Sequence, residues 1–356
     1  MRVKLEDVCE RGSSNIKQSD IIKMSGNYPI YGASGLAGKV NFYHQEKSYV
    51  AVVKDGAGIG RTTLNPAKSS VIGTMQYLIP KKNVLPEYLF YVVSYMHLEK
   101  YYTGATIPHI YFKDYKNEEF NLDNIEKQLE IIDVLGRCKK AIEARKQELV
   151  ELDRLTKARF VELFGSIREE RLLGEISEFV TVGIANSATH AYAESGIPML
   201  RNQNIKENYL DDSDLIYIKP EFAAKYKAKN LKENDIIVMR TGYPGVACLV
   251  PKKYEGCQTF TTLIVRIKPD NNPNYVCVYI NSGFGKQFIN SEKVGVAQQN
   301  VGAKSLAKMP IKIAPKELQN QFADFVAQVN KSKVAVQKAL DETQLLFDSL
   351  MQKYFG

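Results

Sequence analysis

The sequence predicts an α+β protein with a pseudo-two-fold repeat, in which two similar, strand-rich globular domains are separated by two long antiparallel helices that form a coiled coil. Two observations predict this fold class. Residues 124–164 contain no proline and one glycine, and residues 316–355 contain neither. Both stretches close on Phe-Gly, in FVELFG (160–165) and KYFG (353–356). A chain of 356 residues is also long for a single core, which favours two domains.

An internal repeat relates the two halves of the chain. With a shift of 191 residues, Gln128 falls on Gln319 and Gly165 falls on Gly356. Weaker matches relate VKLEDVC (3–9) to RLLGEIS (171–177), YPIYGASG (28–35) to IPMLRNQN (197–204), and VVKDG (52–56) to VMRTG (238–242). The shift grows along the chain, so the second copy carries loop insertions. Two copies of one unit of about 170–190 residues are the simplest account.

Each copy has a strand-rich part followed by a helical part. YVAVVKDG and DIIVMRTGYPG are short apolar runs, rich in β-branched residues, that stop at glycine. SSVIGTMQYLIP and TFTTLIVRIKP are further strand candidates, and EYLFYVVSYMHLEKYY (87–102) is expected to be a helix packed into a core. The predicted boundaries are residues 1–120 and 167–314 for the globular domains, and residues 121–166 and 315–356 for the helical segments.

Apolar residues recur every seven positions in both helical segments, which is typical of a coiled coil. Each segment carries two apolar columns, which are interrupted by Arg145 and Thr156 in the first segment and by Lys333 and Thr343 in the second. Such polar interruptions lower stability but can fix the register. An antiparallel pair would give the protein two similar faces. The alternative is two amphipathic helices that pack on separate cores.

Positive charge is concentrated in the globular parts. The whole net charge is +8; residues 1–120 carry +4 and residues 171–314 carry +5, whereas residues 121–170 and 315–356 carry −1 and 0. Phosphate binding requires cations on such surfaces, and a duplex with two half-sites would suit a pseudo-two-fold protein. Charge alone is a weak signal, because many lysines are simply solvated.

Several function classes lack their motifs. No GxxxxGK[ST], [DNS]PP[YF] or GxSxG stretch is present, which argues against ATP binding, adenine methylation and nucleophilic hydrolysis by this chain. The loop KDGAGIGRT (54–62) is expected to be either a tight loop that approaches a DNA backbone or only a turn, rather than a nucleotide site. Five cysteines and four histidines lack disulfide or metal spacing, and Asp211, Asp212 and Asp214 are expected to be exposed loop acids. No apolar run reaches the length of a membrane span, and no signal peptide is seen, so we expect a cytoplasmic protein.

Three stretches carry a resemblance that covers essentially the whole chain. They are VGVAQQNVGAKSLAKMPIKIAPKELQNQFADFV (294–326), IPMLRNQNI (197–205) and NDIIVMRTGYPG (234–245). With these stretches the chain resembles the specificity subunit of a type I restriction–modification system, a family with two target-recognition domains and two conserved helical regions. The first half departs from the pattern, because TGATIPHIYFKDY (103–115) has Pro-His where the second half has Gln-Gln-Asn.

The resemblance implies a reader of DNA without chemistry of its own. Each target-recognition domain would read one half of a split target, and the helical pair would fix the unread spacer and dock the modification subunits. Those subunits would methylate adenine with S-adenosylmethionine, and restriction subunits that use ATP would join them, so no cofactor is expected on this chain. The alternatives are a coiled-coil scaffold that binds proteins, a stand-alone DNA-modifying enzyme, and a system that only methylates.

Arg, Asn and Gln are the leading candidates for reading base edges, because they combine donors and acceptors or present paired donors. In the second half the expected DNA-binding residues follow apolar runs or glycines; they are Arg201, Asn202, Gln203, Asn204, Arg240, Thr241, Tyr243, Gln298, Gln299 and Asn300. In the first half they are Tyr31, Ser34, Lys39, Lys54, Arg61, Thr106, His109, Tyr111 and Lys113. No catalytic or metal-binding residue is expected. For each position the alternative is an ordinary solvated loop.

Overall fold

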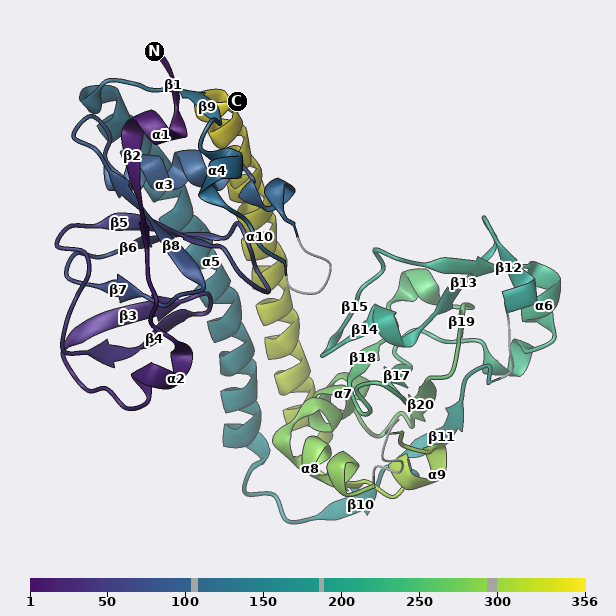
Figure 1. The fold of residues 1–356 in the computed structure, drawn as a ribbon. Coiled ribbons are helices and arrows are strands. Elements are labelled where there is room, and N and C mark those ends of the chain that lie inside the picture. The colour runs from purple at the N-terminus through teal and green to yellow at the C-terminus, as the bar shows by residue number, and fades with distance from the viewer. Residues whose placement is uncertain (104–107, 186–188, 293–299) are drawn as a thin grey trace. The chain divides into compact units, whose positions relative to one another are not determined.

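The computed structural model describes residues 1–103, 108–185, 189–292 and 300–356, and it divides into two compact units. Unit 1 comprises Met1–Glu148 and Val336–Gly356, and unit 2 comprises Leu149–Ala335. The two long helices, α5 (Ile125–Phe164) and α10 (Lys316–Phe355), each contribute one part to each unit (Figure 1). Each unit therefore combines strands, short helices and one part of both long helices.

Unit 1 is built on a four-stranded antiparallel sheet in the order β2-β8-β5-β6. Its strands are β2 (Cys9–Ser13), β5 (Tyr49–Val53), β6 (Thr62–Asn65) and β8 (Met75–Pro80). A second sheet, in the order β4-β3-β7, contains β3 (Tyr28–Gly32), β4 (Gly35–Val40) and β7 (Ser70–Val71), and β1 (Arg2–Lys4) pairs with β9 (Glu119–Asn121). The shorter helices are α1 (Leu5–Val8), α2 (Gln18–Ile21), α3 (Pro86–Tyr95), the 3₁₀ turn η1 (Leu98–Tyr101) and α4 (Phe112–Tyr115).

Unit 2 has a four-stranded sheet in the equivalent order β11-β20-β17-β18. Its strands are β11 (Ser177–Val182), β17 (Ile236–Val238), β18 (Ala247–Leu249) and β20 (Leu263–Ile267). The second sheet, β12-β16-β13-β19, contains β12 (Tyr192–Ala193), β13 (Ile197–Leu200), β16 (Ile216–Ile218) and β19 (Gln258–Thr259). Two further pairs are β10 (Glu170–Leu172) with β21 (Pro310–Lys312) and β14 (Ile205–Lys206) with β15 (Tyr209–Leu210). The shorter helices are α6 (Pro220–Ala224), α7 (Pro273–Asn281), α8 (Gly283–Glu292) and α9 (Ala303–Leu306), and the 3₁₀ turns are η2 (Thr189–Ala191), η3 (Asn202–Asn204), η4 (Lys227–Lys229) and η5 (Lys252–Tyr254).

The two units follow one plan, as the internal repeat predicted. Leu5 N donates a hydrogen bond to Glu118 O at 2.9 Å in unit 1. Leu173 N donates to Met309 O at 2.8 Å in unit 2. The two donors are 168 positions apart and the two acceptors are 191 apart, which are the shifts of the sequence matches. The repeat is therefore visible in backbone hydrogen bonds as well as in apolar pattern.

The weaker sequence match between YPIY (28–31) and IPML (197–200) also corresponds to equivalent strands in the two units. These stretches form β3 and β13, and each makes the parallel pairing of its sheet. Tyr31 pairs with Val71, and Leu200 pairs with Thr259. A parallel pairing between segments so far apart in sequence is an unusual feature to find twice in one chain, so it supports duplication of the whole domain.

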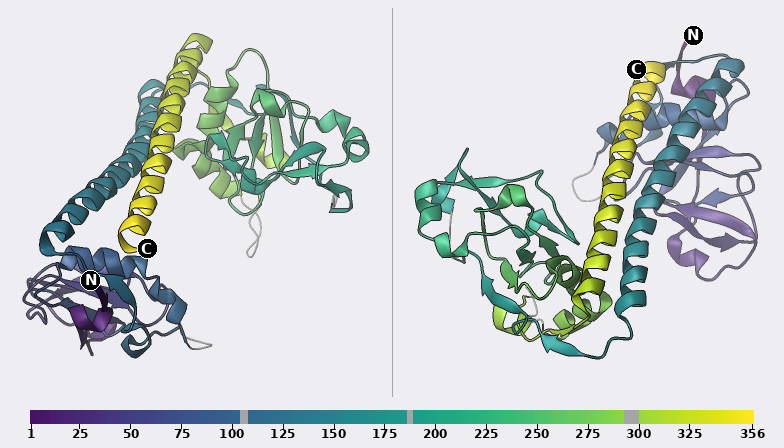
Figure 2. Two further views of the ribbon diagram at one scale, coloured as in Figure 1. Left: turned by 90° about the horizontal axis from the view of Figure 1, so that it is seen from above. Right: turned by 180° about the vertical axis from the view of Figure 1, so that it is seen from behind.

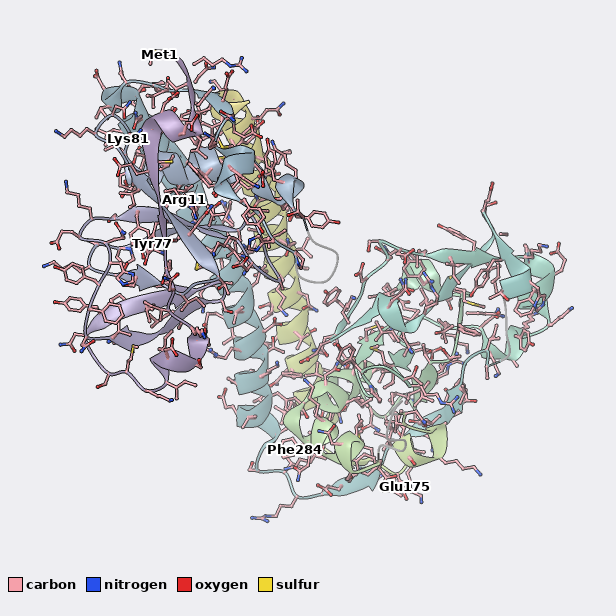
Figure 3. The ribbon with its side chains drawn as sticks, in the orientation of Figure 1. Met1, Arg11, Tyr77, Lys81, Glu175 and Phe284 are labelled. Carbon is pink, nitrogen blue, oxygen red and sulfur yellow. The ribbon has the colours of Figure 1, made fainter. Side chains whose placement is uncertain are left out.

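The central strand β5 is buried along its whole length, as expected for a strand with neighbours on both sides. Tyr77 on the adjacent strand β8, labelled in Figure 3, is 1% exposed. Its hydroxyl accepts a hydrogen bond from Val71 N at 2.9 Å. Since Val71 belongs to β7, this bond links the two sheets of unit 1.

The helix predicted over residues 87–102 is interrupted. α3 ends at Tyr95, and the 3₁₀ turn Leu98–Tyr101 follows it. Between them His97 adopts a left-handed backbone conformation with φ 51°, which a helix cannot continue through. The expected core packing is present, because Tyr88 and Leu89 of α3 are fully buried.

α5 and α10 run antiparallel within each unit (Figure 2). In unit 1, Ile131 and Leu135 of α5 share an apolar core with Met351 of α10. Farther along α5, Arg145 contacts Thr343, which lies earlier in α10. Later residues of α5 therefore contact earlier residues of α10, which is the pattern of an antiparallel pair.

The same direction holds in unit 2, where the helix ends enter the domain core. Phe160 and Phe164 of α5 share an apolar core with Phe322 and Val326 of α10. The rings of Phe164 and Phe322 lie edge to face, with centroids 5.3 Å apart. The helices thus pair with each other and also complete the cores of the units. Their apolar stripes therefore serve both as a coiled-coil seam and as faces that pack on separate cores.

The polar residues that interrupt the heptads have partners. In unit 1, Arg145 Nη1 donates to Thr343 Oγ1, so two interruptions meet. In unit 2, Lys333 forms an ion pair with Asp153, and Thr156 Oγ1 donates to the carbonyl four residues before it at 3.2 Å. Paired polar groups inside a helix seam favour one register, because any slip would leave them without partners. Among the described residues no helix is apolar enough over sufficient length to cross a bilayer.

A buried glutamine ties the beginning of α5 to unit 1. Gln128 is fully buried, and its Oε1 accepts from Leu85 N at 2.9 Å. Its Nε2 donates to Asn83 O at 3.0 Å and to Asp123 O at 2.9 Å. Leu85 is the N-cap residue of α3, so one side chain joins the starts of two helices.

Gln319 repeats this arrangement at the beginning of α10. It is 1% exposed, and its Oε1 accepts from Asn272 N at 2.8 Å. Its Nε2 donates to Ala314 O at 2.9 Å and to Asn271 Oδ1 at 3.2 Å. Asn272 is the N-cap residue of α7, the counterpart of α3. The glutamine that matched at a shift of 191 residues is therefore a repeated structural anchor.

Replacing Gln319 with alanine is expected to lower the free energy of unfolding by about 1–3 kcal/mol, because a buried donor and a buried acceptor would lose their partner. Urea denaturation measures the effect, and hydrogen exchange at the start of α7 locates it. Gln321→Ala changes an exposed glutamine two residues farther along α10 and is expected to cost less than about 0.5 kcal/mol. Equal effects for the two variants would contradict the anchor.

Candidate nucleic-acid interface

In unit 1, loops from three parts of the chain meet at the end of the central strand β5. Arg61 Nη1, on the loop after β5, donates to Ala33 O at 2.9 Å, on the turn between β3 and β4. Ile110 N, just before α4, donates to Lys54 O at 2.9 Å, at the beginning of the loop after β5. The predicted DNA-binding residues that these loops carry are Ser34, Lys54, Arg61, His109 and Tyr111.

The side chains on these loops form a polar and aromatic cluster. His109 contacts the Asp55 carboxylate, and Lys54 Nζ lies 3.5 Å from Asp55. The Tyr111 ring lies 4.2 Å from the His109 ring, and Lys113 Nζ lies 5.1 Å from the Tyr111 centroid. Burial, and then the nearby Lys54 ammonium, lower the pKa of His109.

Glycines shape the loop after β5. Gly56, Gly58 and Gly60 have φ of 83°, 87° and 79°, a region that side chains with a Cβ rarely occupy. Within the described part of the chain, a Cβ at Gly56 would meet no atom within 4 Å. A Cβ at Gly58 would lie 2.8 Å from the Arg61 guanidinium. The GxGxG stretch thus forms a tight loop that carries Lys54 and Arg61, as expected.

The remaining predicted residues of unit 1 lie on the second sheet or beyond the described residues. Tyr31 on β3 is half-buried and packs against the core that contains Tyr77. Lys39 is exposed on β4, opposite Pro29. Thr106 lies outside the described residues.

The equivalent loops of unit 2 meet in the same way. Val301 N donates to Arg240 O at 3.1 Å, at positions equivalent to Ile110 and Lys54. Thr241, next to Arg240, forms a β-bridge with Asn300, as Asp55 does with His109. The backbone of the interface is therefore the same in both units, although its side chains differ.

The turn after β13 joins this interface through Asn202. Its Nδ2 donates to Thr241 Oγ1 at 2.9 Å and to Thr241 O at 3.3 Å. Arg201 Nε, Asn202 Oδ1 and Arg240 Nε are buried and have no hydrogen-bond partner within the described part of the chain. Each such atom costs about 1–3 kcal/mol if it stays unsatisfied. Three such atoms lie close to the contact between Asn202 and Thr241.

Residues 201–214 form a turn that side-chain hydrogen bonds hold together. Asn204 is 1% exposed; its Oδ1 accepts from Arg201 N at 2.9 Å, and its Nδ2 donates to Asp211 O at 2.9 Å and to Asp214 O at 3.0 Å. Arg201 Nη2 lies 3.2 Å from Asp214 Oδ2, and Gln203 Nε2 donates to the same oxygen. Asn204 therefore acts inside the protein, whereas the other two predicted side chains are held together by Asp214.

Tyr243 is one of the exposed predicted residues that the structure describes in unit 2. It is 78% exposed and stands between Gly242 and Gly245, whose φ are 80° and 97°. An exposed aromatic side chain on a glycine-rich loop is suited to stacking or to phosphate contact. Gln298 and Gln299 lie outside the described residues.

Two acidic residues lie among these side chains, although they are not among the predicted DNA-binding residues. Asp55 contacts His109, and Asp214 holds Arg201 and Gln203. Carboxylates repel phosphate, so composition alone argues against them. Asp55 directly follows the predicted Lys54, which is a signal that the sequence offered, whereas Asp214 stands ten positions after Asn204 and meets Arg201 only through folding.

Metal and thiol chemistry have no support in the described residues. No group of three or more His, Cys, Asp or Glu side chains there is placed to hold a metal ion. All five cysteines are free thiols. Burial raises the pKa of Cys9 and Cys248 to about 12, so these thiols stay protonated and unreactive at neutral pH.

The two domains follow one plan, and each carries polar, charged and aromatic side chains on loops at the end of its central sheet. This arrangement is of the class expected for a protein that reads DNA with two domains. The sequence matches the family described as type I restriction modification DNA specificity domain over residues 1–154 and 168–343. The chain belongs to this family, and it recognises a DNA target as part of a type I restriction–modification system.

Solved structures agree on the fold. The S subunit of a type I restriction–modification system from M. genitalium has a TM-score of 0.65 at 15% sequence identity, over 100% of this chain and 96% of that one. A chain from a structural study of complex assembly and conformational transition of the type I R-M system has a TM-score of 0.58 at 13% identity, over 99% and 97% of the two chains. No curated protein matches the sequence.

Asn204→Ala is expected to lower the free energy of unfolding of unit 2 by about 1–3 kcal/mol, because the Arg201 amide and two carbonyls would lose a buried partner. Denaturant unfolding measures the loss, and faster hydrogen exchange across residues 201–214 locates it. Gln203→Ala, which removes an exposed side chain from the same turn, is the control and is expected to change stability by less than about 0.5 kcal/mol. Unchanged exchange in Asn204→Ala would contradict the role of Asn204.

Proposed function

We propose that each unit reads one half of a bipartite DNA target and that partner subunits, rather than this chain, methylate and cleave the DNA. The observation that carries the proposal is the duplicated interface, in which the Ile110–Lys54 bond of unit 1 recurs as the Val301–Arg240 bond of unit 2. Two copies of one interface on one chain suit two half-sites. Residues 1–120 and 167–314 are the proposed recognition domains. The cytoplasmic location stays a prediction.

We divide the proposed contacts by chemistry. Side chains with several donors or with both donors and acceptors are assigned to base edges; these are Arg201, Asn202, Gln203, Arg240, Gln298, Gln299, Asn300 and His109. Cations, hydroxyls and tyrosines are assigned to phosphates or to stacking; these are Lys39, Lys54, Arg61, Lys113, Ser34, Thr106, Thr241, Tyr31, Tyr111 and Tyr243. Asn204 is assigned to positioning, because it is buried and fully engaged in its turn.

Sequencing the methylated positions of a genome in cells with and without this chain tests the proposal. We expect a split, adenine-methylated motif that is present only when the chain is expressed together with its modification subunits. Methylation by the purified chain alone, with S-adenosylmethionine, would favour a stand-alone enzyme instead. A continuous motif, or no motif, would contradict reading by two domains.

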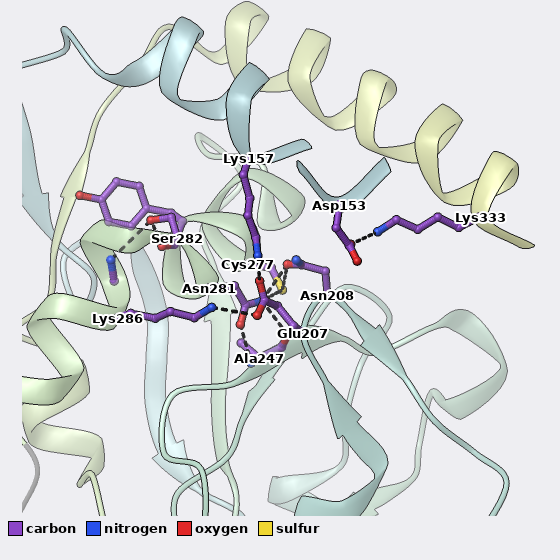
Figure 4. Close-up of polar contacts among 12 residues, drawn as sticks. Asp153, Lys157, Glu207, Asn208, Ala247, Cys277, Asn281, Ser282, Lys286 and Lys333 are labelled. Carbon is purple, nitrogen blue, oxygen red and sulfur yellow. Dashed lines mark hydrogen bonds and ion pairs between the residues drawn. The ribbon is translucent and has the colours of Figure 1, made fainter. Parts of the chain in front are cut away.

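Docking of the modification subunits is proposed at a groove in each unit. The groove in unit 2 has a volume of about 550 Å³ and lies between the long helices and the α7–α8 region (Figure 4). Phe160 and Val161 of α5, Val326 of α10 and Phe284 of α8 form its apolar lining. On its rim, Glu207 pairs with Lys157 at 3.3 Å and with Lys286 at 2.8 Å. Apolar lining with a charged rim is the usual anatomy of a protein interface.

Unit 1 has a corresponding groove of about 600 Å³. Its lining includes Tyr91 of α3, Ile142 of α5 and Met351 of α10. Met351 stands 191 positions after Phe160, and Tyr91 stands 187 positions before Val278, so repeat-related residues line both grooves. Equivalent grooves on one chain are suited to two copies of one partner, which supports one modification subunit for each unit.

Val161→Glu is expected to abolish binding of one of the two modification subunits, because it places a charge on the apolar lining of the groove in unit 2. Val161 is 59% exposed, so the change leaves the fold intact. Native mass spectrometry of the assembled complex measures the stoichiometry. Val150→Glu, at a 51% exposed position of α5 that lines neither groove, is the control. Full assembly of Val161→Glu would contradict docking at this groove.

A further inference from the structure

Asp214 is an acidic side chain at a surface that is proposed to meet a polyanion. Its side chain is 70% exposed. A free carboxylate there would repel the phosphates of DNA, which lowers affinity for every sequence alike. A carboxylate at such a position therefore requires a role that outweighs this repulsion.

The position of Asp214 is fixed from both its backbone and its side chain. Its carbonyl oxygen accepts from Asn204 Nδ2 at 3.0 Å and from Arg201 Nη2 at 3.2 Å. Its carboxylate Oδ2 accepts from Arg201 Nη2 at 3.2 Å and from Gln203 Nε2. Asn204 is buried and holds the backbone of this turn. The side chains of Arg201, Gln203 and Asp214 are therefore held together on it.

The other carboxylate oxygen of Asp214, Oδ1, has no hydrogen-bond partner among the described residues, and the side chain is exposed. Within the described residues, both side-chain bonds of Asp214 go to Oδ2, and none goes to Oδ1. In the major groove, cytosine N4 and adenine N6 donate hydrogen bonds, whereas guanine O6 and thymine O4 accept them. A fixed carboxylate oxygen can pair with the first two groups, but it would face a lone pair on the last two.

We propose that Asp214 is a specificity-determining residue of unit 2, whose Oδ1 accepts a hydrogen bond from the exocyclic amino group of a cytosine or an adenine in the second half-site. Its Oδ2 meanwhile positions Arg201 and Gln203 beside that base. The keto group of the wrong base is rejected, because two acceptors would then oppose each other. This inference rests on the proposed function of unit 2 as the reader of one half-site.

The effect is confined to one half of the target. The repeat shift grows from 169 residues at β3 and β13 to 186 residues at β5 and β17, so the turn around Asp214 lies in a segment that is longer in unit 2. In unit 1 the acidic residue of the interface is Asp55, which is engaged by His109 and Lys54. The first half-site therefore serves as an internal reference.

The test uses the complex of the full chain with its modification subunits and two variants, Asp214→Asn and Asp214→Ala. Methylated motifs are sequenced in cells, and binding is measured against a library in which each base of the target is varied. Asp212→Asn is the matched control: it removes one negative charge from the same loop, where Asp212 accepts from Tyr254 Oη at 2.7 Å and pairs with Lys253.

We expect both Asp214 variants to lose about 5- to 30-fold discrimination between amino-bearing and keto-bearing bases at one position of the second half-site. An amide presents both a donor and an acceptor, and alanine presents neither, so each variant stops selecting the amino group. The first half-site and the Asp212→Asn control are expected to keep their preferences.

Unchanged discrimination in both Asp214 variants would overturn the inference, and so would an equal change for every sequence or a change in the first half-site. Failure of the proposed function has a different signature, because the unmodified complex would then show no bipartite motif at all. The two failures are thus distinguishable in one experiment.

Discussion

The buried glutamine at the start of each long helix is the constraint on which the rest of the structure depends. Gln128 and Gln319 each join the first turn of a long helix to the N-cap of a helix that covers the domain core. One side chain satisfies both a donor and acceptors in a place that water does not reach, so its loss cannot be compensated by solvent. Through this contact each long helix becomes part of a folded unit rather than an independent rod.

The central sheets position the loops of the two proposed recognition surfaces. Strands β5 and β17 are buried along their whole length, which fixes the loops that leave their ends. In each unit the next hydrogen bond, from Ile110 or Val301, locks the loop that follows the strand against a second segment from far along the chain. The backbone of the interface is thus determined by the core, and side chains can vary on it without changing the fold.

A fixed backbone with variable side chains explains how one duplicated domain can read the two different half-sites that we propose. Lys54 and Asp55 of unit 1 correspond to Arg240 and Thr241 of unit 2, and His109 corresponds to Asn300. The equivalent positions carry different donors and acceptors, while their backbone bonds are the same. The longer segment of unit 2 adds the Asp214 turn, which has its own polar network.

The sequence by itself determined the two long helices, because proline is absent and glycine almost absent over residues 124–164 and 316–355. It also determined the repeat, because apolar spacing survives when identity is lost. Only the tertiary structure decided which polar groups meet. The pairing of Arg145 with Thr343, the burial of Asn204 and the contact of Arg201 with Asp214 depend on segments brought together by folding. A hydrogen bond acts over about 3 Å between groups whose spacing along the chain is arbitrary, so no local pattern encodes it.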